Sequence, residues 1–315
     1  MDHAPRPTAS GTATANAPLA QATPARHPAP LCFPDGQTLT LDRPRIMGVL
    51  NVTPDSFRDG GRFNTIDTAV TQGLALAQQG ATLIDVGGES SRPGAARVEP
   101  GEQIARTAPV IAPLREALDN AGFAAVQISI DTTRAPVAEA ALEAGAAMIN
   151  DISAGREDPD LFRVAASHGT PVVLMHMHGQ PRTMQHNPTY QDVVAQITAF
   201  LHERVAAAVK AGVSESQVVV DPGIGFGKTV AHNLAILRAL PDLVRVGPPV
   251  LLGTSRKSFL AKLTGHPELR AEPDPAGGSA ATTALGVRAG VRLFRVHDAE
   301  LNRQAADTAF AWSQG

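Results

Sequence analysis

Three polar side chains end short apolar runs of the chain: Asp131, Asn150 and Asp221. Together they offer carboxylate and amide groups beside apolar residues. Such a set suits a flat heterocycle with amine and lactam edges, because buried hydrogen-bond donors must meet acceptors. Lys257, which follows another apolar run, could contact a carbonyl or nitrogen of that ring. These residue types therefore predict a site for a small heterocyclic ligand.

A second group of residues brings positive charge to comparable positions. Arg92 and His297 follow apolar runs, Arg295 lies near the end of one, and Asn51 adds a side-chain oxygen. Guanidinium groups form paired hydrogen bonds with phosphate oxygens, and Mg²⁺ takes oxygen ligands. We interpret this group as a site for diphosphate and Mg²⁺.

A helix is expected over residues 256–264, directly after Thr254 and Ser255. The free backbone N–H groups at a helix N-terminus attract negative charge. A ligand carboxylate is therefore expected near Ser258.

Other polar residues of these segments have a structural interpretation. A carboxylate at a strand end often caps the next helix, and we expect Asp151 and Asp298 to have a structural role such as capping or ion pairing. The glycine-rich segment before Lys228 lacks the spacing of a P-loop or a dinucleotide fingerprint, and Lys228 itself is expected to be solvated at a helix start. His176 and His178 are two residues apart, so a strand would point them to opposite faces and a zinc site is disfavoured.

Eight short apolar runs precede the polar segments, and helical stretches separate them. The runs lack polar alternation, as expected of strands buried on both faces of a parallel sheet. Eight strand–helix units over about residues 45–312 predict an α/β fold, a (β/α)8 TIM barrel, with every polar segment on one rim. A doubly wound open sheet is the alternative, and it usually has fewer strands and a single special turn. The runs are IMGVL (46–50), TLIDV (82–86), VQISI (126–130), AAMIN (146–150), PVVLM (171–175), QVVVD (217–221), PVLLG (249–253) and VRLFRV (291–296).

Length and composition limit the classes of function. The chain has 315 residues, of which 43% are hydrophobic and 18% charged, so a mainly disordered chain is excluded. Aromatic residues make up only 4% and the net charge is -3, which argues against a nucleic-acid-binding surface. The single cysteine, Cys32, excludes a disulfide framework and a cysteine zinc cluster. Without a long apolar stretch or a signal-peptide pattern, the chain is expected to be cytoplasmic and to have no membrane partner.

The N-terminal part differs in composition from the rest. Residues 1–30 are dominated by Ala, Pro, Thr and Ser without apolar periodicity, and we expect a disordered tail there. A transit peptide is the alternative, although it would need more arginine. Residues 31–42 alternate around a Pro-Asp-Gly turn signal and predict a short hairpin. Residues 31–315 are then expected to form a single barrel domain.

Seven of these segments resemble dihydropteroate synthase, the folate-pathway enzyme that sulfonamides target. The resemblance covers essentially the whole chain after residue 40, with the strands in the correct order, and the first two motifs are long and specific. The segments are MGVLNVTPDSFRDGG (47–61), DVGGESSRPGA (85–95), SIDTT (129–133), INDI (149–152), DPGIGFGK (221–228), SRKS (255–258) and RVHD (295–298).

The resemblance implies a transferase of folate biosynthesis. The family joins p-aminobenzoate to 6-hydroxymethyl-7,8-dihydropterin diphosphate, which gives 7,8-dihydropteroate and diphosphate. It also implies Mg²⁺ as the cofactor, held at Asn51, and a homodimer. The loops after the first two strands are expected to close over the site and exclude water.

The resemblance further implies a role for each matching residue. The pterin would lie against Asp131, Asn150, Asp221 and Lys257. The diphosphate would lie near Asn51, Ser91, Arg92, Arg295 and His297. The p-aminobenzoate would lie among Phe57, Pro93, Phe226, Lys257 and Ser258. The residues implied in catalysis are Asp131, which would stabilise positive charge on the pterin methylene, Arg92, which would stabilise the departing diphosphate, and Lys257.

Four positions depart from the common family pattern, namely Ser91, Arg58, Ile224 and His178. None of them removes an implied ligand, so an active enzyme is expected. Two alternatives stay open. A pterin-dependent methyltransferase would share the barrel but lack the two long loops, and a binding-only paralogue would have lost the diphosphate or aminobenzoate residues.

Overall fold

The structure is a computed structural model that describes residues 28–53, 62–92, 94–180, 182–245, 247–263 and 276–314. Most of the expected N-terminal tail lies outside these residues, as do Phe57, Arg58 and Pro93.

Eight parallel strands of the described chain form the central sheet, in the order β8-β7-β6-β5-β4-β3-β10-β9. A parallel bridge between Val220 and Val250 links its two edges, and the Val220 N–H donates to Pro249 O at 2.9 Å. The sheet is therefore a nearly closed barrel, which confirms the predicted fold and excludes the open sheet. The strands are β3 (Arg45–Asn51), β4 (Leu83–Gly87), β5 (Gln127–Asp131), β6 (Met148–Asp151), β7 (Val172–Met175), β8 (Val218–Asp221), β9 (Leu251–Leu252) and β10 (Leu293–Val296).

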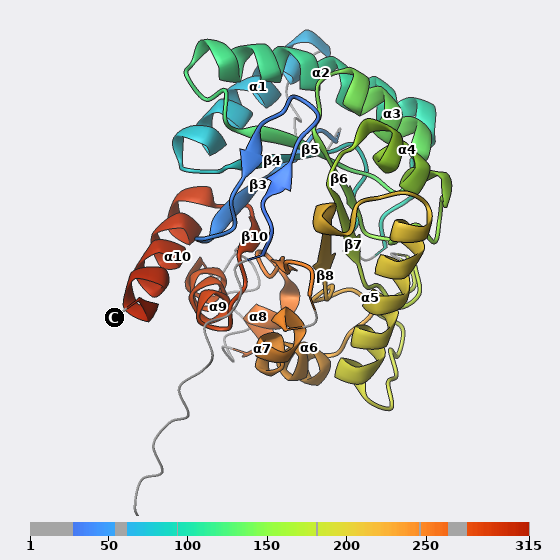
Figure 1. Cartoon of the computed structure of the whole chain (residues 1–315), viewed down its shortest axis with the longest axis vertical. Coiled ribbons are helices and arrows are strands. Elements are labelled where there is room, and N and C mark those ends of the chain that lie inside the picture. Colours follow the sequence, from blue (N-terminus) through green and yellow to red (C-terminus); the bar gives the residue numbers. More distant parts are fainter. Residues whose placement is uncertain are drawn as a thin grey trace, which may run out of the picture.

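Helices surround the strands on the outside (Figure 1). In α5, Asp192 caps the first turn by accepting from the N–H groups of Val194 and Ala195. Val209, near the end of this helix, is exposed. The helices are α1 (Arg62–Gln78), α2 (Pro100–Asn120), α3 (Ala135–Glu143), α4 (Asp160–His168), α5 (Val193–Lys210), α6 (Val230–Arg238), α7 (Leu240–Val244), α8 (Ser258–Leu263), α9 (Ala276–Arg288) and α10 (Ala299–Ser313), with a 3₁₀ turn at Glu215–Gln217.

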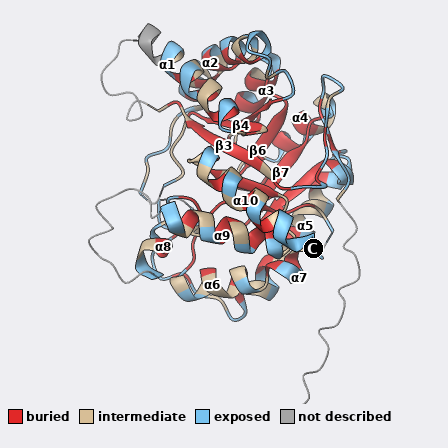
Figure 2. Ribbon diagram, turned by 90° about the vertical axis from the view of Figure 1, so that its left-hand side faces the viewer, coloured by how far each residue is buried: buried red, intermediate tan, exposed pale blue. Residues whose placement is uncertain are grey.

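Successive side chains of each strand alternate between two apolar layers. Ile46 and Ile84 point outward into the core between strands and helices, whereas Met47 and Leu83 point into the barrel. Burial on both sides leaves the strands almost entirely covered, while the helices keep one exposed face (Figure 2). This explains why the strands read as continuous apolar runs.

The predicted hairpin consists of β1 (Leu31–Cys32) and β2 (Thr38–Leu39), paired antiparallel. Its side chains Leu31, Phe33, Leu39 and Leu41 join the inner cluster formed by the first residues of the barrel strands. The hairpin thus closes the N-terminal end of the barrel. The polar segments lie at the opposite end, which is therefore the end where we expect a ligand to enter.

Candidate functional site

Strand pairing brings the polar strand ends into one row at the C-terminal mouth. Asn51 pairs with Gly87, Gly87 with Asp131, and Asp131 with Asn150. A Cβ added to Gly87 would lie 3.7 Å from Asn51 Oδ1 and 3.8 Å from Asp131 Oδ2, so both oxygens lie over this glycine. The structure therefore brings these three predicted site residues together.

Arg295 connects two carboxylates inside the mouth. Its Nη2 donates to Asp131 Oδ2 at 2.7 Å, and its Nε donates to Asp85 Oδ2 at 2.6 Å. The same oxygen of Asp85 accepts from Asn150 Nδ2 at 2.9 Å. Asp85 is 0% exposed, and sequence reasoning treated it only as part of a motif. It aligns two of the predicted ligand-binding side chains, and its position two residues before Gly87 on β4 is the signal that could have identified it as facing inward.

Burial has opposite effects on the partners of this group. It raises the pKa of Asp131, and the charge of Arg295 offsets this only in part because Asp85 adds a second negative charge nearby. For Arg295, burial lowers the pKa, but the two carboxylates outweigh it and the pKa is raised overall. The guanidinium therefore stays charged, while Asp131 holds its proton more readily than an ordinary aspartate.

Asp221 lies on the other side of the mouth, at the end of β8. Its Oδ1 accepts from the Gly223 N–H at 2.6 Å, and burial raises its pKa, an effect that the charge of Lys257 opposes. Lys257 Nζ donates to Ile224 O at 2.5 Å and lies 4.7 Å from the centre of the Phe226 ring. Burial lowers the pKa of Lys257 to about 8. Asp221, Lys257 and Phe226 thus lie together on one side of the mouth.

Lys228 differs from the sequence expectation. It was expected to be solvated, but it is 3% exposed, and its Nζ lies 3.0 Å from His176 Nδ1 while donating to Phe226 O at 3.0 Å and His176 O at 3.3 Å. The expectation was wrong because the chain turns back at the glycine-rich segment. The long lysine stem therefore runs beneath the loop rather than into solvent.

The glycine-rich segment has a packing role. Gly223 has a φ of 66°, and a Cβ there would lie 1.9 Å from His176 O. Gly227 has a φ of 62°, and a Cβ there would lie 2.4 Å from His178 O. Only glycine combines a left-handed backbone with such a close approach to the segment after β7. The G-x-G-x-G spacing is therefore explained by this close contact between two backbone segments.

Positive charges converge on His297. Its Nδ1 lies 3.1 Å from Ser255 Oγ. Burial and the charges of four nearby cations together lower the pKa of His297 to about 3; the cations are Arg256, Arg295, Arg92 and Lys257. So many cations around one point form a positive potential suited to an anionic ligand.

The segment between β9 and α8 carries the remaining predicted residues. Arg256 has a φ of 58°, a left-handed conformation that is uncommon for a residue with a side chain and often occurs at functional sites. Ser258 is the exposed first residue of α8, which is only six residues long and so shorter than expected. Ser258 thus lies beside Lys257 at the start of this helix.

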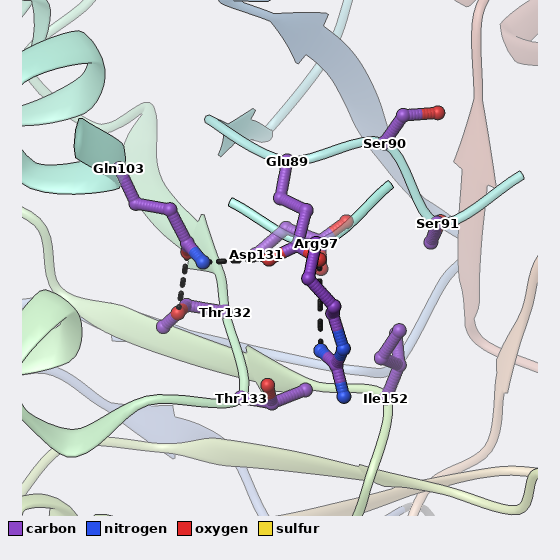
Figure 3. A pocket seen from close by; sticks show the side chains of 9 residues that line it. All are labelled: Glu89, Ser90, Ser91, Arg97, Gln103, Asp131, Thr132, Thr133 and Ile152. Atoms are coloured by element: carbon purple, nitrogen blue, oxygen red, sulfur yellow. Dashed lines mark hydrogen bonds and ion pairs between the residues drawn. The ribbon is translucent and has the colours of Figure 1, made fainter. Parts of the chain in front are cut away.

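A pocket at the mouth lies beneath the loop that follows β4. Ser91 and Glu89 contribute to its wall from that loop, and Asp131 contributes from β5 (Figure 3). The predicted Ser91 therefore shares a cavity with the predicted Asp131. Arg92 follows directly and is exposed.

Two other carboxylates act structurally, as predicted. Asp151 accepts from the N–H groups of Ser153 and Gly155 in the turn after β6. Asp298 caps α10 by accepting from the Leu301 N–H at 3.0 Å.

Oxygen donors at the mouth fit a magnesium ion. Asn51 Oδ1 lies over Gly87 at the end of β3, and the cations around His297, after the neighbouring β10, supply a place for phosphate oxygens. A side-chain oxygen beside such a place suits Mg²⁺, which keeps several waters and binds through one or two protein oxygens together with substrate phosphates. Within the described residues no group of three or more His, Cys, Asp or Glu side chains is arranged to hold a metal.

Among the described helices, none is both long and apolar enough to cross a membrane.

Comparison with known proteins identifies close relatives. The family model described as pterin binding enzyme matches residues 47–297. The dihydropteroate synthase of Synechocystis sp. is 45% identical over 287 residues, which are 90% of this chain and 95% of that protein. The dihydropteroate synthase of Mycobacterium leprae is 44% identical over 278 residues, 87% of this chain and 95% of that protein.

Solved structures agree with this relationship. Xanthomonas albilineans dihydropteroate synthase with 4-aminobenzoic acid superposes with a TM-score of 0.80 at 44% identity, covering 92% of this chain and 98% of that one. The same enzyme in complex with 7,8-dihydropteroate gives 0.76 at 41% identity, with 91% and 99% covered. Yersinia pestis dihydropteroate synthase with a sulfonamide drug complex gives 0.81 at 40% identity, with 91% and 100% covered.

Proposed function

The chain belongs to the dihydropteroate synthase family of pterin-binding enzymes, and we propose that the barrel mouth described above carries out the family's reaction with the residues named here. A dihydropterin diphosphate and p-aminobenzoate give 7,8-dihydropteroate and diphosphate, in folate biosynthesis. The bond between the pterin methylene carbon and the diphosphate oxygen breaks, and the diphosphate leaves with the electron pair. The amine nitrogen of p-aminobenzoate forms the new bond to that carbon and then loses a proton.

One observation carries the proposal. The partly buried carboxylate of Asp131 and the buried carboxylate of Asp221 lie at the same end of the barrel as the cations around His297. The first pair suits a neutral ring that donates hydrogen bonds, and the second group suits an anion. A pterin diphosphate has both parts in one molecule.

We assign the pterin to the strand ends. Asp221 accepts hydrogen bonds from the amino-pyrimidine edge, and Lys257 donates to a ring carbonyl or nitrogen. Asn150 is held by Asp85 at 2.9 Å, which fixes its amide for the ring edge. These side chains stand on rigid strands or are tied to them, so the pocket needs little rearrangement on binding.

Asp131 and Arg92 act on the two charges that separate in the transition state. Positive charge develops on the pterin methylene, and the ionised Asp131 stabilises it. Negative charge develops on the leaving diphosphate, which Arg92, Arg295 and His297 bind, with Ser91 donating a hydrogen bond through its hydroxyl. Because burial raises the pKa of Asp131, activity is expected to fall as the pH falls through that raised value.

Mg²⁺ is proposed to bind at Asn51 together with diphosphate oxygens. When bound, the ion supplies positive charge that stabilises the leaving group.

The p-aminobenzoate is proposed to lie near Lys257, Phe226 and Ser258. The Phe226 ring is partly exposed, so it can stack with the ring of p-aminobenzoate. The carboxylate of p-aminobenzoate then lies near Ser258. Phe57 and Pro93, which belong to the loops after β3 and β4, would complete this site.

A homodimer is proposed as the functional form. Leu285 on α9 and Trp312 on α10 are 65% and 78% exposed, on two helices that pack against each other. Burial of such large apolar side chains favours association of two copies. Sedimentation of the purified chain would test this, and a monomer at all concentrations would contradict it.

The test of the function is an assay with both substrates. With Mg²⁺, pterin diphosphate and p-aminobenzoate, the chain should release diphosphate and form dihydropteroate in equal amounts. Without p-aminobenzoate, diphosphate release should be much slower. Asp131→Asn should abolish most of the activity, whereas Glu143→Gln at the exposed end of α3 serves as the control. Release of diphosphate without any dihydropteroate would refute the proposal.

A further inference from the structure

The loop that carries Ser91 and Arg92, residues 88–99 between β4 and α2, is fixed at both roots to α2. Gln103 Nε2 donates to Glu89 Oε2 at 2.6 Å near the start of the loop and to Val98 O at 2.9 Å near its end. Gln103 is 1% exposed, so these bonds are shielded from water. One buried side chain, Gln103, therefore holds both ends of the loop.

Arg97 connects the same loop to a second part of the barrel rim. Its Nη2 donates to Glu157, which lies between β6 and α4, and its Nη1 lies 3.5 Å from Glu89 Oε1. Glu157 also accepts from Thr133 Oγ1 at 2.7 Å, and Thr133 follows β5. One guanidinium therefore joins the segments after three neighbouring strands.

The position of this cluster relates it to the site. Arg97 and Thr133 line the same pocket as Ser91 and Asp131, and the Arg97 side chain lies across it (Figure 3). The side chains of Arg97 and Glu157 are 39% and 17% exposed, so the pair is partly shielded from solvent. Charge-assisted bonds of this kind are stronger than those of fully exposed pairs.

The protonation states of the two carboxylates decide which of them is the main partner of Arg97. Burial raises the pKa of Glu157, but hydrogen bonds from Arg97 and Thr133 outweigh this and leave the pKa lowered. Glu157 is therefore ionised at neutral pH and able to hold the guanidinium. The pKa of Glu89 is raised by its burial, which Arg97 only partly offsets, so Glu157 is the main partner.

We propose that Arg97 and Glu157 form a latch, and that Arg97 is a positioning residue that holds the loop with Ser91 and Arg92 where the diphosphate binds. The latch rests on the proposed function, because it acts through the residues assigned to the diphosphate. It joins segments 60 residues apart in the chain, and among the described residues its hydrogen bonds and ion pairs link it to Glu89 and Thr133. Neither Asn150 nor Asp221, which form the floor of the pterin pocket, is among these partners. Its loss should therefore affect the diphosphate and spare the pterin ring.

The experiment compares Glu157→Gln with the unaltered chain. In the variant, kcat/KM for pterin diphosphate should fall about three- to tenfold, as expected for loss of a partly buried ion pair. Hydrogen exchange of residues 89–98 should become several-fold faster, while the Kd for a pterin without diphosphate stays the same. Arg97→Gln should have the same effects, and the double variant should be no worse than either single one.

Arg163→Gln is the matched control, because Arg163 pairs with Asp160 at 3.4 Å on exposed α4 nearby and should change none of these values. An unchanged kcat/KM in Glu157→Gln would overturn the latch, as would additive losses in the double variant. An equal loss of affinity for the pterin alone would also overturn it, because that would show a general disturbance of the barrel. If the unaltered chain forms no dihydropteroate, the proposed function fails, and unchanged hydrogen exchange in Glu157→Gln would then separately refute the latch.

Discussion

Replacement of Asp85 by asparagine changes the charge inside the mouth with little change in shape. Asp85 is 0% exposed and accepts from Arg295 Nε at 2.6 Å and Asn150 Nδ2 at 2.9 Å. Asparagine keeps an acceptor oxygen for one of these donors but carries no charge. Arg295 also binds Asp131 at 2.7 Å, so in the unaltered chain two carboxylates share one cation.

The expected shift follows from this shared cation. Two carboxylates on one guanidinium lie roughly 5 Å apart, and at an effective dielectric constant of about 20 they repel each other by about 3 kcal/mol. That energy corresponds to at most about two pKa units. The charge of Asp85 raises the pKa of Asp131, so Asp85→Asn should lower it. The acid limb of the pH profile should then move to lower pH by about one to two units.

The assay measures kcat/KM for pterin diphosphate between about pH 5 and pH 9, and the reaction is monitored through the release of diphosphate. The free energy of unfolding should fall by about 1–3 kcal/mol in the same variant, because a buried charged hydrogen bond is weakened. Asp119→Asn is the control, since Asp119 binds Arg115 at 2.7 Å on the exposed side of α2. An acid limb that stays in place or moves to higher pH would refute the shared-cation arrangement.

Other variants address the rest of the molecule. Asp221→Ala should weaken pterin binding at least about tenfold in calorimetry, because ring donors would be left unpaired in a buried site; unchanged affinity would mean that the carboxylate only caps Gly223. Lys228→Met should lower the free energy of unfolding by about 2–4 kcal/mol in urea titrations, because the groups that the ammonium binds lose their partner; a loss within error would contradict its structural role. Phe33→Ala should cost about 3–5 kcal/mol of stability, since it removes a buried ring from the closed end of the barrel. Removal of residues 1–30 should leave the melting temperature and the turnover nearly unchanged, because their composition offers little apolar surface; a clear drop in melting temperature would show that this segment packs on the barrel.

The fold was predictable because each barrel strand can be recognised from its own local sequence. Each is buried on both faces, so it reads as an apolar run bounded by glycine, proline or polar residues. The hairpin was also predictable from its turn, but its place was not. Nothing in residues 31–42 indicates that Leu31 and Phe33 contact the inner residues of strands far along the chain.

The site was predictable where a residue stands at a strand end. Asp131 and Asn150 could be assigned to one rim because parallel strands end at the same side of a barrel. The role of Asp85 could not be read in this way, since its partner Arg295 is 210 residues away. The burial of Lys228 escaped prediction for a similar reason, because it depends on the backbone path that Gly223 and Gly227 permit.

The distribution of charge in the mouth explains how the site can bind the pterin ring and the diphosphate of one substrate in different places. Buried charges are costly unless they are paired, and here carboxylates and cations are balanced inside the barrel. They are Asp85, Asp131 and Asp221 against Arg295, Lys257 and Lys228. This group of six side chains therefore has little net charge and suits a neutral pterin ring. Arg92 and Arg256 are the surplus cations around His297, and both are exposed at the rim. The surplus lies where the diphosphate must leave, so Arg92 adds charge for the leaving group that the carboxylates do not offset, whereas Arg295 belongs to both groups.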